Sequence, residues 1–519
     1  MKRRLAVAVS FLLLSTAVWA ALEPREEIIP FESEWMYNYG DPDDMSRKLG
    51  WKTIKAPVRI KLQEENRAAA FYFRKQFETP DPDEITSLLI EIRYTGGVAA
   101  YINGVEVLRR SPSEYPPYMT SMHGDDVQEI FTGISSSMLR DGVNQIAVEI
   151  HLPKDEKVKR LNFALRLAAG KGFHIIKGPY LQNLSKNSVT IMWETDLPST
   201  SEVYYGEGLS AKEDAPKTIH EITLRELKPD TIYFYHVLSR VPEDRRLPKG
   251  VPSYVLSKVY SFKTAIEQGE PFKFIVYGDS RSNPEIHSKL AKLMEKASPA
   301  FLVNTGDLVS RGQNYREWAE HFFGPLEPLI SRIPIWTVIG NHERSHLNYF
   351  NFFSLPGNEA WYSFDYGDAH FLMIDTEFDY SPGSDQYRFI ADDLSNCKAK
   401  WKFVAFHKPP YTAVRRRMPG NIRVREVLNP LFERYGVDMV FCGHDHNYVR
   451  SKPINGVIYV ITGGGGAGLY EVMPAESLDW AEVAVATHHF CVLEIKENTL
   501  RLTAVDENGN IIDRFNLYK

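Results

Sequence analysis

Six side chains that can bind a metal ion follow apolar runs in the C-terminal half of the chain. The runs end in the segments VYGD, NTGD, VIGN, AFH and FCGHDH. Their metal-binding residues are Asp279, Asp307, Asn341, His407, His444 and His446. Ligand sites in α/β sheets gather at the carboxyl ends of strands, so we expect these side chains to lie together. Each one alone has a plainer interpretation, as a turn residue or a hydrogen-bonded loop histidine. Their joint occurrence in this order favours a metal site.

The residue types suit two metal ions and a phosphate ester. Two cations about 3.5–4 Å apart repel one another and need a carboxylate between them, and Asp307 is the candidate bridge. His444 and His446 are one residue apart and can point to neighbouring ions. Neutral His and Asn complete the sites without negative charge that would repel a phosphate. The predicted reaction is metal-assisted hydrolysis of a phosphoester.

Three regions that differ in their pattern of apolar and polar residues must position these side chains. Residues 26–170 alternate apolar and polar positions, and Asn103-Gly104 between two such runs predicts a β-hairpin. Residues 173–265 contain short strands with a turn about every ten residues, as in a sandwich. From residue 271 to 519, continuous apolar strands alternate with helical stretches such as EIHSKLAKLMEKA, which predicts an α/β domain.

Both β regions resemble known modules. The segments FRKQF and YINGVEV make residues 26–170 similar to the jelly-roll, galactose-binding-like modules of secreted hydrolases. That resemblance implies a carbohydrate contact through the N-terminal β domain. The segment LKPDTIYFYHV resembles the tyrosine-corner region of fibronectin type III domains and places such a domain at 173–265.

The C-terminal motifs resemble the calcineurin-like metallophosphoesterases, closest to the purple acid phosphatase branch. The order Gly-Asp, Gly-Asp, Gly-Asn-His-Glu, His and Gly-His-x-His covers about 272–495. The resemblance implies a four-layer α/β/β/α sandwich and two divalent or trivalent ions of Fe, Mn or Zn. His342 would contact the leaving-group oxygen. The first ion would take Asp279, Asp307 and His446, and the second would take Asp307, Asn341, His407 and His444.

Two positions depart from the family pattern. Arg281 stands where typical members have a His, and Ser310 stands where purple acid phosphatases have the iron-binding Tyr. A guanidinium stays protonated and cannot ligate a metal, so the first site lacks one protein ligand. Asn283, Ser280 or water could fill the gap, the first site could be weak, or Arg281 could bind the substrate phosphate. Arg281 could also be a solvated turn residue.

Net charge, the N-terminal segment and the cysteine count narrow the class of protein and its location. The chain has 519 residues and a net charge of −6, which does not indicate nucleic-acid binding. Residues 1–20, with three basic residues before an apolar run, predict a signal peptide and a secreted or periplasmic protein. The alternative is an uncleaved anchor. We expect no membrane span after cleavage. Three cysteines cannot all pair internally, and we expect them to be buried as small hydrophobic side chains.

The predicted function is that of an exported metal-dependent phosphoesterase acting on small phosphorylated molecules. Monoesters, diesters and nucleotides all remain open as substrates. The run Arg415, Arg416 and Arg417 is either a solvated face or an attractor for a polyanionic substrate. The alternative function is a carbohydrate-binding or adhesion protein with a degenerate phosphatase domain. The complete set of candidate ligands argues against that alternative.

Overall fold

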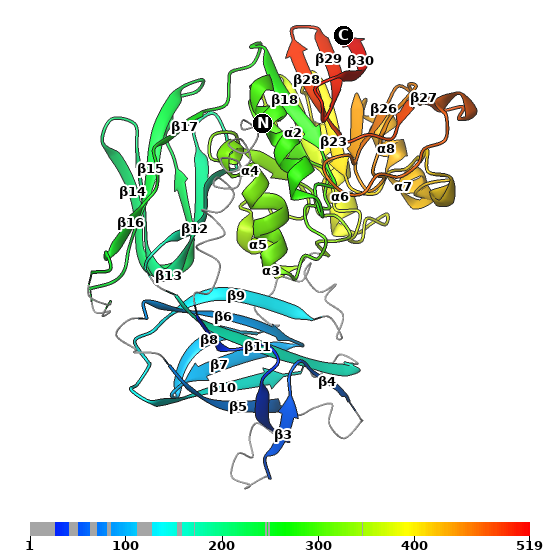
Figure 1. Ribbon diagram of the computed structural model, residues 1–519. Helices are drawn as coiled ribbons and strands as arrows, with labels where there is room; N and C mark the ends of the chain where they lie inside the picture. The colour runs from blue at the N-terminus through cyan, green and yellow to red at the C-terminus, as the bar shows by residue number, and fades with distance from the viewer. Residues whose placement is uncertain are drawn as a thin grey trace, which may run out of the picture.

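The computed structural model describes residues 26–40, 50–62, 70–79, 85–111, 127–152, 158–170, 172–243, 247, 250–344 and 346–519. The predicted signal peptide lies outside these residues. Figure 1 shows a β-rich N-terminal part, a second β part beside it, and a C-terminal part of strands and helices. This arrangement confirms the predicted fold class of two β parts followed by an α/β part. None of the helices in the described ranges is long and apolar enough to cross a membrane.

The N-terminal part consists of two antiparallel sheets packed face to face. Strands such as β10 alternate buried and more exposed residues because successive side chains point to opposite faces of a sheet. The rings of Phe73 and Phe163 stack 4.0 Å apart between the sheets. The predicted hairpin is confirmed, with Asn103 and Gly104 at φ 51° and 82° between β7 and β8. The strands are β1 (Glu26–Ile29), β2 (Glu34–Gly40), β3 (Lys52–Lys55), β4 (Val58–Lys61), β5 (Ala70–Glu78), β6 (Ser87–Tyr94), β7 (Gly97–Ile102), β8 (Val105–Arg110), β9 (Gln128–Ser135), β10 (Val143–His151) and β11 (Arg160–Gly170).

The second part is built on one long strand, β13, which pairs with β12, β14 and β15. The hydroxyl of Tyr233 accepts a hydrogen bond from the backbone N–H of Lys228 at 3.0 Å. This bond is the contact of a tyrosine corner, which the LKPDTIYFYHV segment predicts. The strands are β12 (Ile175–Gln182), β13 (Val189–Tyr205), β14 (Leu209–Leu224), β15 (Ile232–Arg240), β16 (Tyr254–Leu256) and β17 (Tyr260–Lys263).

The C-terminal part contains two sheets that face each other. The first has the order β20-β19-β18-β28-β29-β30, and the second has the order β21-β22-β23-β24-β26-β25-β27. Strands β18, β19 and β20 run parallel, as do β22, β23, β24 and β26. The strands are β18 (Phe272–Tyr277), β19 (Phe301–Asn304), β20 (Ile335–Thr337), β21 (Tyr362–Tyr366), β22 (Ala369–Met373), β23 (Trp401–Phe406), β24 (Met439–Cys442), β25 (Tyr448–Ser451), β26 (Ile458–Thr462), β27 (Ala481–Val485), β28 (His489–Lys496), β29 (Thr499–Asp506) and β30 (Ile511–Tyr518).

Helices cover the outer faces of both sheets and complete the four layers. Leu290 and Met294 of α2 pack on the first sheet, while Ile390 of α6 and Phe432 of α8 pack on the second. Between the sheets the rings of Phe274 and Phe403 lie 5.4 Å apart. The helices are α2 (Pro284–Ala297), α3 (Tyr315–Glu317), η5 (Trp318–Phe323), α4 (Gly324–Ile330), α5 (Leu347–Phe352), α6 (Asp385–Asn396), η6 (Arg415–Arg417), α7 (Ile422–Val427), α8 (Asn429–Arg434) and η7 (Ala475–Ser477).

The three cysteines all lie in described residues and all are free. Cys442 and Cys491 are buried, as predicted. Cys397 is only half-buried, because it follows the end of α6 rather than lying in a strand.

Candidate metal centre

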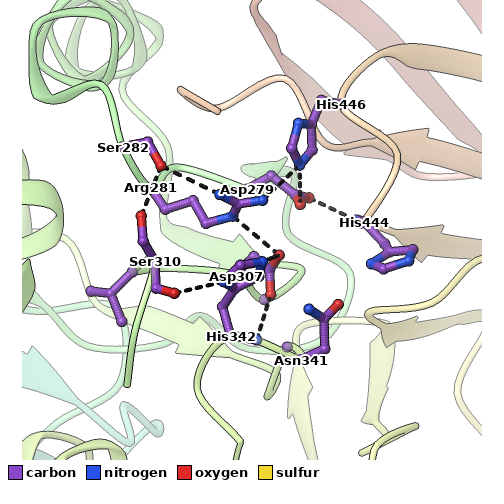
Figure 2. A network of polar contacts seen from close by, with 12 residues as sticks. Asp279, Arg281, Ser282, Asp307, Ser310, Asn341, His342, His444 and His446 are labelled. Atoms are coloured by element: carbon purple, nitrogen blue, oxygen red, sulfur yellow. Dashed lines mark hydrogen bonds and ion pairs between the residues drawn. The ribbon is translucent and has the colours of Figure 1, made fainter. Parts of the chain in front are cut away.

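The six predicted ligands come together between the two sheets, in the turns that follow β18, β19, β20, β23 and β24. The strand tips therefore come from two facing sheets, all at the carboxyl ends. Figure 2 shows several of these side chains around Asp307. Asp279, Asp307, His407 and His446 are buried, and Asn341 and His444 are half-buried.

The second donor set consists of Asp307, Asn341, His407 and His444. The His407 Nε2 atom lies 3.2 Å from Asp307 Oδ1, 3.2 Å from Asn341 Oδ1 and 3.2 Å from His444 Nδ1. The Nδ1 atom of His407 lies 2.9 Å from the carbonyl of Thr305, so Nδ1 donates and a neutral ring carries its lone pair on Nε2. The oxygen atoms of Asp307 and Asn341 and the ring nitrogens of His407 and His444 therefore lie close together. This donor set fits a metal ion.

The first donor set consists of Asp279, Asp307 and His446, whose ligand atoms all lie within 4.8 Å of one another. His446 Nδ1 lies 2.6 Å from the carbonyl of Gly468, so Nε2 is the nitrogen that faces Asp279 Oδ1 at 3.4 Å. Asp279 Oδ2 accepts the backbone N–H of His444 at 2.8 Å, whereas no described residue hydrogen-bonds the buried Asp279 Oδ1. The unpartnered oxygen fits a cation, although the described residues bring together three Asp and His donor atoms in this set and no fourth. Asp307 belongs to both sets, as predicted for the bridge.

The electrostatics of the cluster favour positive charge next to Asp307. Burial opposes the charged form of His407, but the Asp307 carboxylate outweighs burial and raises the pKa of His407 to about 10. Burial and then the charge of His407 lower the pKa of His444 to about 2. Burial would raise the pKa of Asp307, but neighbouring positive groups, His407 first, hold that pKa below its usual range.

Backbone conformation presents three of these residues to the site. Asp279, Asp307 and His444 have φ angles of 55°, 56° and 68°, the left-handed region where Asp and His are enriched among non-glycine residues. The turns also approach one another closely. A Cβ atom on Gly340 would lie 2.3 Å from the backbone nitrogen of Asp307, so only glycine fits there.

Glu343 organises the site, and sequence reasoning assigned it no role. Its buried carboxylate accepts the backbone N–H groups of Asp307 at 2.9 Å, Gly340 at 2.9 Å and Val309 at 3.1 Å. Burial and the Asp307 charge raise the pKa of Glu343 to about 8, and the N–H donors oppose that change. The fourth position of the Gly-Asn-His-Glu motif was the available signal.

Asp445 is a second residue that sequence reasoning missed. This buried carboxylate lies between His444 and His446 and accepts hydrogen bonds from the Thr412 hydroxyl and from Arg417, the latter at 2.8 Å. Arg417 also donates to the carbonyl of His444 at 2.9 Å. Arg417 therefore fixes the turn that carries both histidines, whereas Arg415 and Arg416 are exposed.

His342 lies at the edge of the cluster. Its backbone N–H donates to Asp307 Oδ1 at 3.1 Å, and its Nδ1 donates to the carbonyl of Ser310 at 2.6 Å. The Nε2 atom then faces Asp307 Oδ2 at 3.7 Å, and the side chain is 30% exposed. This position is open to a ligand and is not part of either donor set.

Neither departure from the family pattern supplies a ligand. The Ser310 hydroxyl lies 2.8 Å from the Ser282 hydroxyl (Figure 2), and the Asn283 side chain caps α2. Arg281 instead reaches into the first donor set, with Nε 3.3 Å from Asp307 Oδ2 and a terminal nitrogen 3.3 Å from His446 Nε2. Its side chain is 16% exposed, so it is not a solvated turn arginine.

The fold and the donor sets define the metallophosphoesterase class: four α/β/β/α layers with carboxylate, amide and imidazole groups at the strand ends. Residues 272–448 match the family described as calcineurin-like phosphoesterase. The chain therefore contains a calcineurin-like phosphoesterase domain, as the motif order predicted.

Its curated relatives include purple acid phosphatases. The chain is 27% identical over 360 residues to "Probable inactive purple acid phosphatase 1" of Arabidopsis thaliana, covering 57% of this chain and 55% of that protein. It is 26% identical over 397 residues to acid phosphatase type 7 of Mus musculus, covering 63% of this chain and 86% of that protein. The chain thus spans about half of one relative and most of the other.

Solved structures show the same fold. The purple acid phosphatase PPD1 from yellow lupin (Lupinus luteus) seeds superposes with a TM-score of 0.60 at 19% identity, covering 87% of this chain and 92% of that chain. A PhoD structure superposes with a TM-score of 0.51 at 12% identity, covering 66% of this chain and 91% of that chain.

Proposed function

We propose that the chain is an exported metal-dependent phosphoesterase that hydrolyses phosphomonoesters, with diesters and nucleotides as further candidate substrates. The observation that carries the proposal is the convergence of two donor sets on one carboxylate, Asp307. The acid phosphatase name of the mouse relative supports the substrate class. The predicted signal peptide supports export to the periplasm or the outside of the cell.

Ions of Fe, Mn or Zn in the two sets would supply positive charge for the phosphate oxygens and acidify a water molecule. Asp307 would hold both ions, Asp279 and His446 the first, and Asn341, His407 and His444 the second. The water releases one proton to the solvent as its oxygen forms a bond to phosphorus, and the bond from phosphorus to the ester oxygen breaks. His342 in its doubly protonated form would donate the Nε2 proton to that leaving oxygen, while its Nδ1 proton stays hydrogen-bonded to the carbonyl of Ser310.

The two β parts complete the proposal. Residues 26–170 would form a jelly-roll module and residues 173–265 a fibronectin type III-like module, with the tyrosine corner at Tyr233 in support. Residues 271–519 would form the catalytic domain. The expected carbohydrate contact has no support in the described residues and is not proposed.

The test is the variant Asp307→Asn, assayed on p-nitrophenyl phosphate and bis-p-nitrophenyl phosphate with metal content measured in parallel. Losing the shared carboxylate should reduce turnover by orders of magnitude, about 10²-fold or more, while circular dichroism stays unchanged. Asp385→Asn is the matched control, because the Asp385 side chain is 83% exposed at the start of α6. Near-wild-type turnover of Asp307→Asn would refute the assignment.

A further inference from the structure

Arg281 lies against the two groups that the first metal ion would need. Its Nε atom is 3.3 Å from Asp307 Oδ2, and one terminal nitrogen is 3.3 Å from His446 Nε2. Its other terminal nitrogen lies 3.3 Å from the Ser282 hydroxyl. Figure 2 shows the guanidinium between the residues of the first donor set.

The contact with His446 uses the lone pair that a metal would use. The carbonyl of Gly468 takes the Nδ1 proton of His446 at 2.6 Å, so Nε2 is the acceptor toward Arg281. A guanidinium is a permanent donor and never an acceptor. Arg281 and a metal ion therefore cannot both bind His446 Nε2.

Among the described residues, the first set has three donors from Asp and His side chains and no fourth Asp, Glu, His or Cys to hold the ion. The nearby hydroxyls of Ser282 and Ser310 bond to each other at 2.8 Å. Asn283 accepts the backbone N–H of Ile286 as the cap of α2. The second set has four donor residues, and none of the four is an arginine or a lysine.

We propose that Arg281 competes with the first metal ion for Asp307 and His446. The resting enzyme then holds one tightly bound ion, in the second set. The Arg281 guanidinium supplies the other positive charge at the phosphate, because two parallel N–H groups match two phosphate oxygens. This inference rests on the proposed phosphoesterase function. It specifies that one metal ion and the Arg281 guanidinium supply the positive charges at the phosphate.

The experiment measures Mn²⁺ stoichiometry in the full chain by equilibrium dialysis and records the electron paramagnetic resonance spectrum of the bound ions. We expect the wild type to bind one Mn²⁺ tightly and to show the hyperfine pattern of an isolated ion. Arg281→His should bind two ions with an exchange-coupled spectrum. Arg281→Gln should bind the first ion about tenfold more tightly than the wild type, since a competing cation is gone. Arg423→His is the control, because Arg423 is a surface residue, 54% exposed, on α7.

Each outcome separates this inference from the proposed function. Two ions of similar affinity in an active wild-type protein would overturn the inference and leave the function intact. Unchanged binding of one ion in both Arg281 variants would overturn the part assigned to Arg281. No tight ion and no hydrolysis in the wild type would overturn both. The wild-type measurement stands even where a variant fails to fold.

Discussion

Backbone carbonyls orient the histidine rings of the site. Thr305, Gly468 and Ser310 accept the Nδ1 protons of His407, His446 and His342, in that order. Each ring therefore presents its Nε2 atom to the cluster. Whether that atom can act as a metal ligand or as an acid depends on the backbone carbonyl that binds Nδ1. The motifs predicted which residues take part. The carbonyls could not be predicted, because any residue type carries one.

The role of His342 can be separated from metal binding. His342→Ala should keep the wild-type metal content and lose activity by about 10²–10⁴-fold, because only the proton donor is removed. The loss should shrink for p-nitrophenyl phosphate, whose leaving group needs little protonation, relative to an alkyl phosphate. Activity on both substrates and metal content are measured in the variant and in His174→Ala, whose histidine lies in the second β part. Metal loss in His342→Ala would show that His342 is a ligand.

Ser310 predicts the colour of the iron-loaded protein. No tyrosine oxygen of the described residues is among the two donor sets, and the Tyr315 hydroxyl is bound to Glu194 at 2.6 Å. We therefore expect iron-reconstituted protein to be colourless in the visible range, and Ser310→Tyr to gain an absorption band. A visible band in the wild type would contradict this expectation. The residue to test next would then be Tyr470, whose ring stacks on His446 at 4.1 Å.

At the scale of elements, the strand pattern located the site but not the layers that hold it. Each apolar strand was predicted with its polar tip, and α2 was predicted by its apolar spacing. Those strands are divided between two facing sheets because of long-range pairings, for example that of β18 with β28. Those partners lie more than about 200 residues apart, and no local pattern encodes such a pairing.

One link between elements should make stability depend on pH. His370 of β22 lies 2.7 Å from Asp365 of β21 and 2.7 Å from Asp393 of α6. Burial alone would lower the pKa of His370, but these two hydrogen bonds outweigh it and raise the pKa to about 10. The ring is charged in the folded state, so its contribution is complete below the unfolded pKa of about 6.5 and is lost as the pH rises toward 10.

The melting temperature measured between pH 6 and pH 10 tests this link. The wild type should lose on the order of 1–2 kcal/mol of stability from this group, a modest amount because Asp365 is 75% exposed. His370→Gln should be less stable at pH 6 and show a shallower decline with pH. Equal slopes for the two proteins would contradict the assignment.

At the scale of the whole molecule, a buried ion pair of the second β part, Lys177 with Glu194, contacts the catalytic part through Phe352 and Tyr315. The ammonium of Lys177 lies 2.6 Å from the Glu194 carboxylate and 3.4 Å from the centre of the Phe352 ring. The Tyr315 hydroxyl donates to the same carboxylate, and Phe131 of the N-terminal part stacks on the Tyr315 ring at 4.6 Å. The three parts therefore meet around α3, close to the loop that carries Ser310.

Breaking that ion pair should destabilise the second β part where it contacts the catalytic part. Lys177→Met leaves the Glu194 charge buried without its ammonium partner and should cost about 3–5 kcal/mol. The double variant Lys177→Met with Glu194→Gln should recover much of the loss, since the amide oxygen can still accept from Tyr315. Thermal melting of both variants and the wild type measures the effect. Lys186→Met is the control, because its pair with Glu267 is exposed. A wild-type melting temperature for Lys177→Met would refute the role of the pair.

The left-handed backbone conformation of Asp279, Asp307 and His444 affects which residues these positions retain during evolution. Most residue types cost about 1–2 kcal/mol in that conformation, and Asn, Asp and Gly cost the least. Selection for folding alone therefore favours Asp, Asn or Gly at positions 279 and 307, whether or not the site still works. In a library of variants screened only for soluble expression, we expect Asp, Asn and Gly to dominate at both positions. A lineage that has lost catalysis would carry Asp, Asn or Gly at these two positions. An aspartate there in a distant relative is therefore weaker evidence of activity than a histidine at position 407, whose backbone has no positive φ.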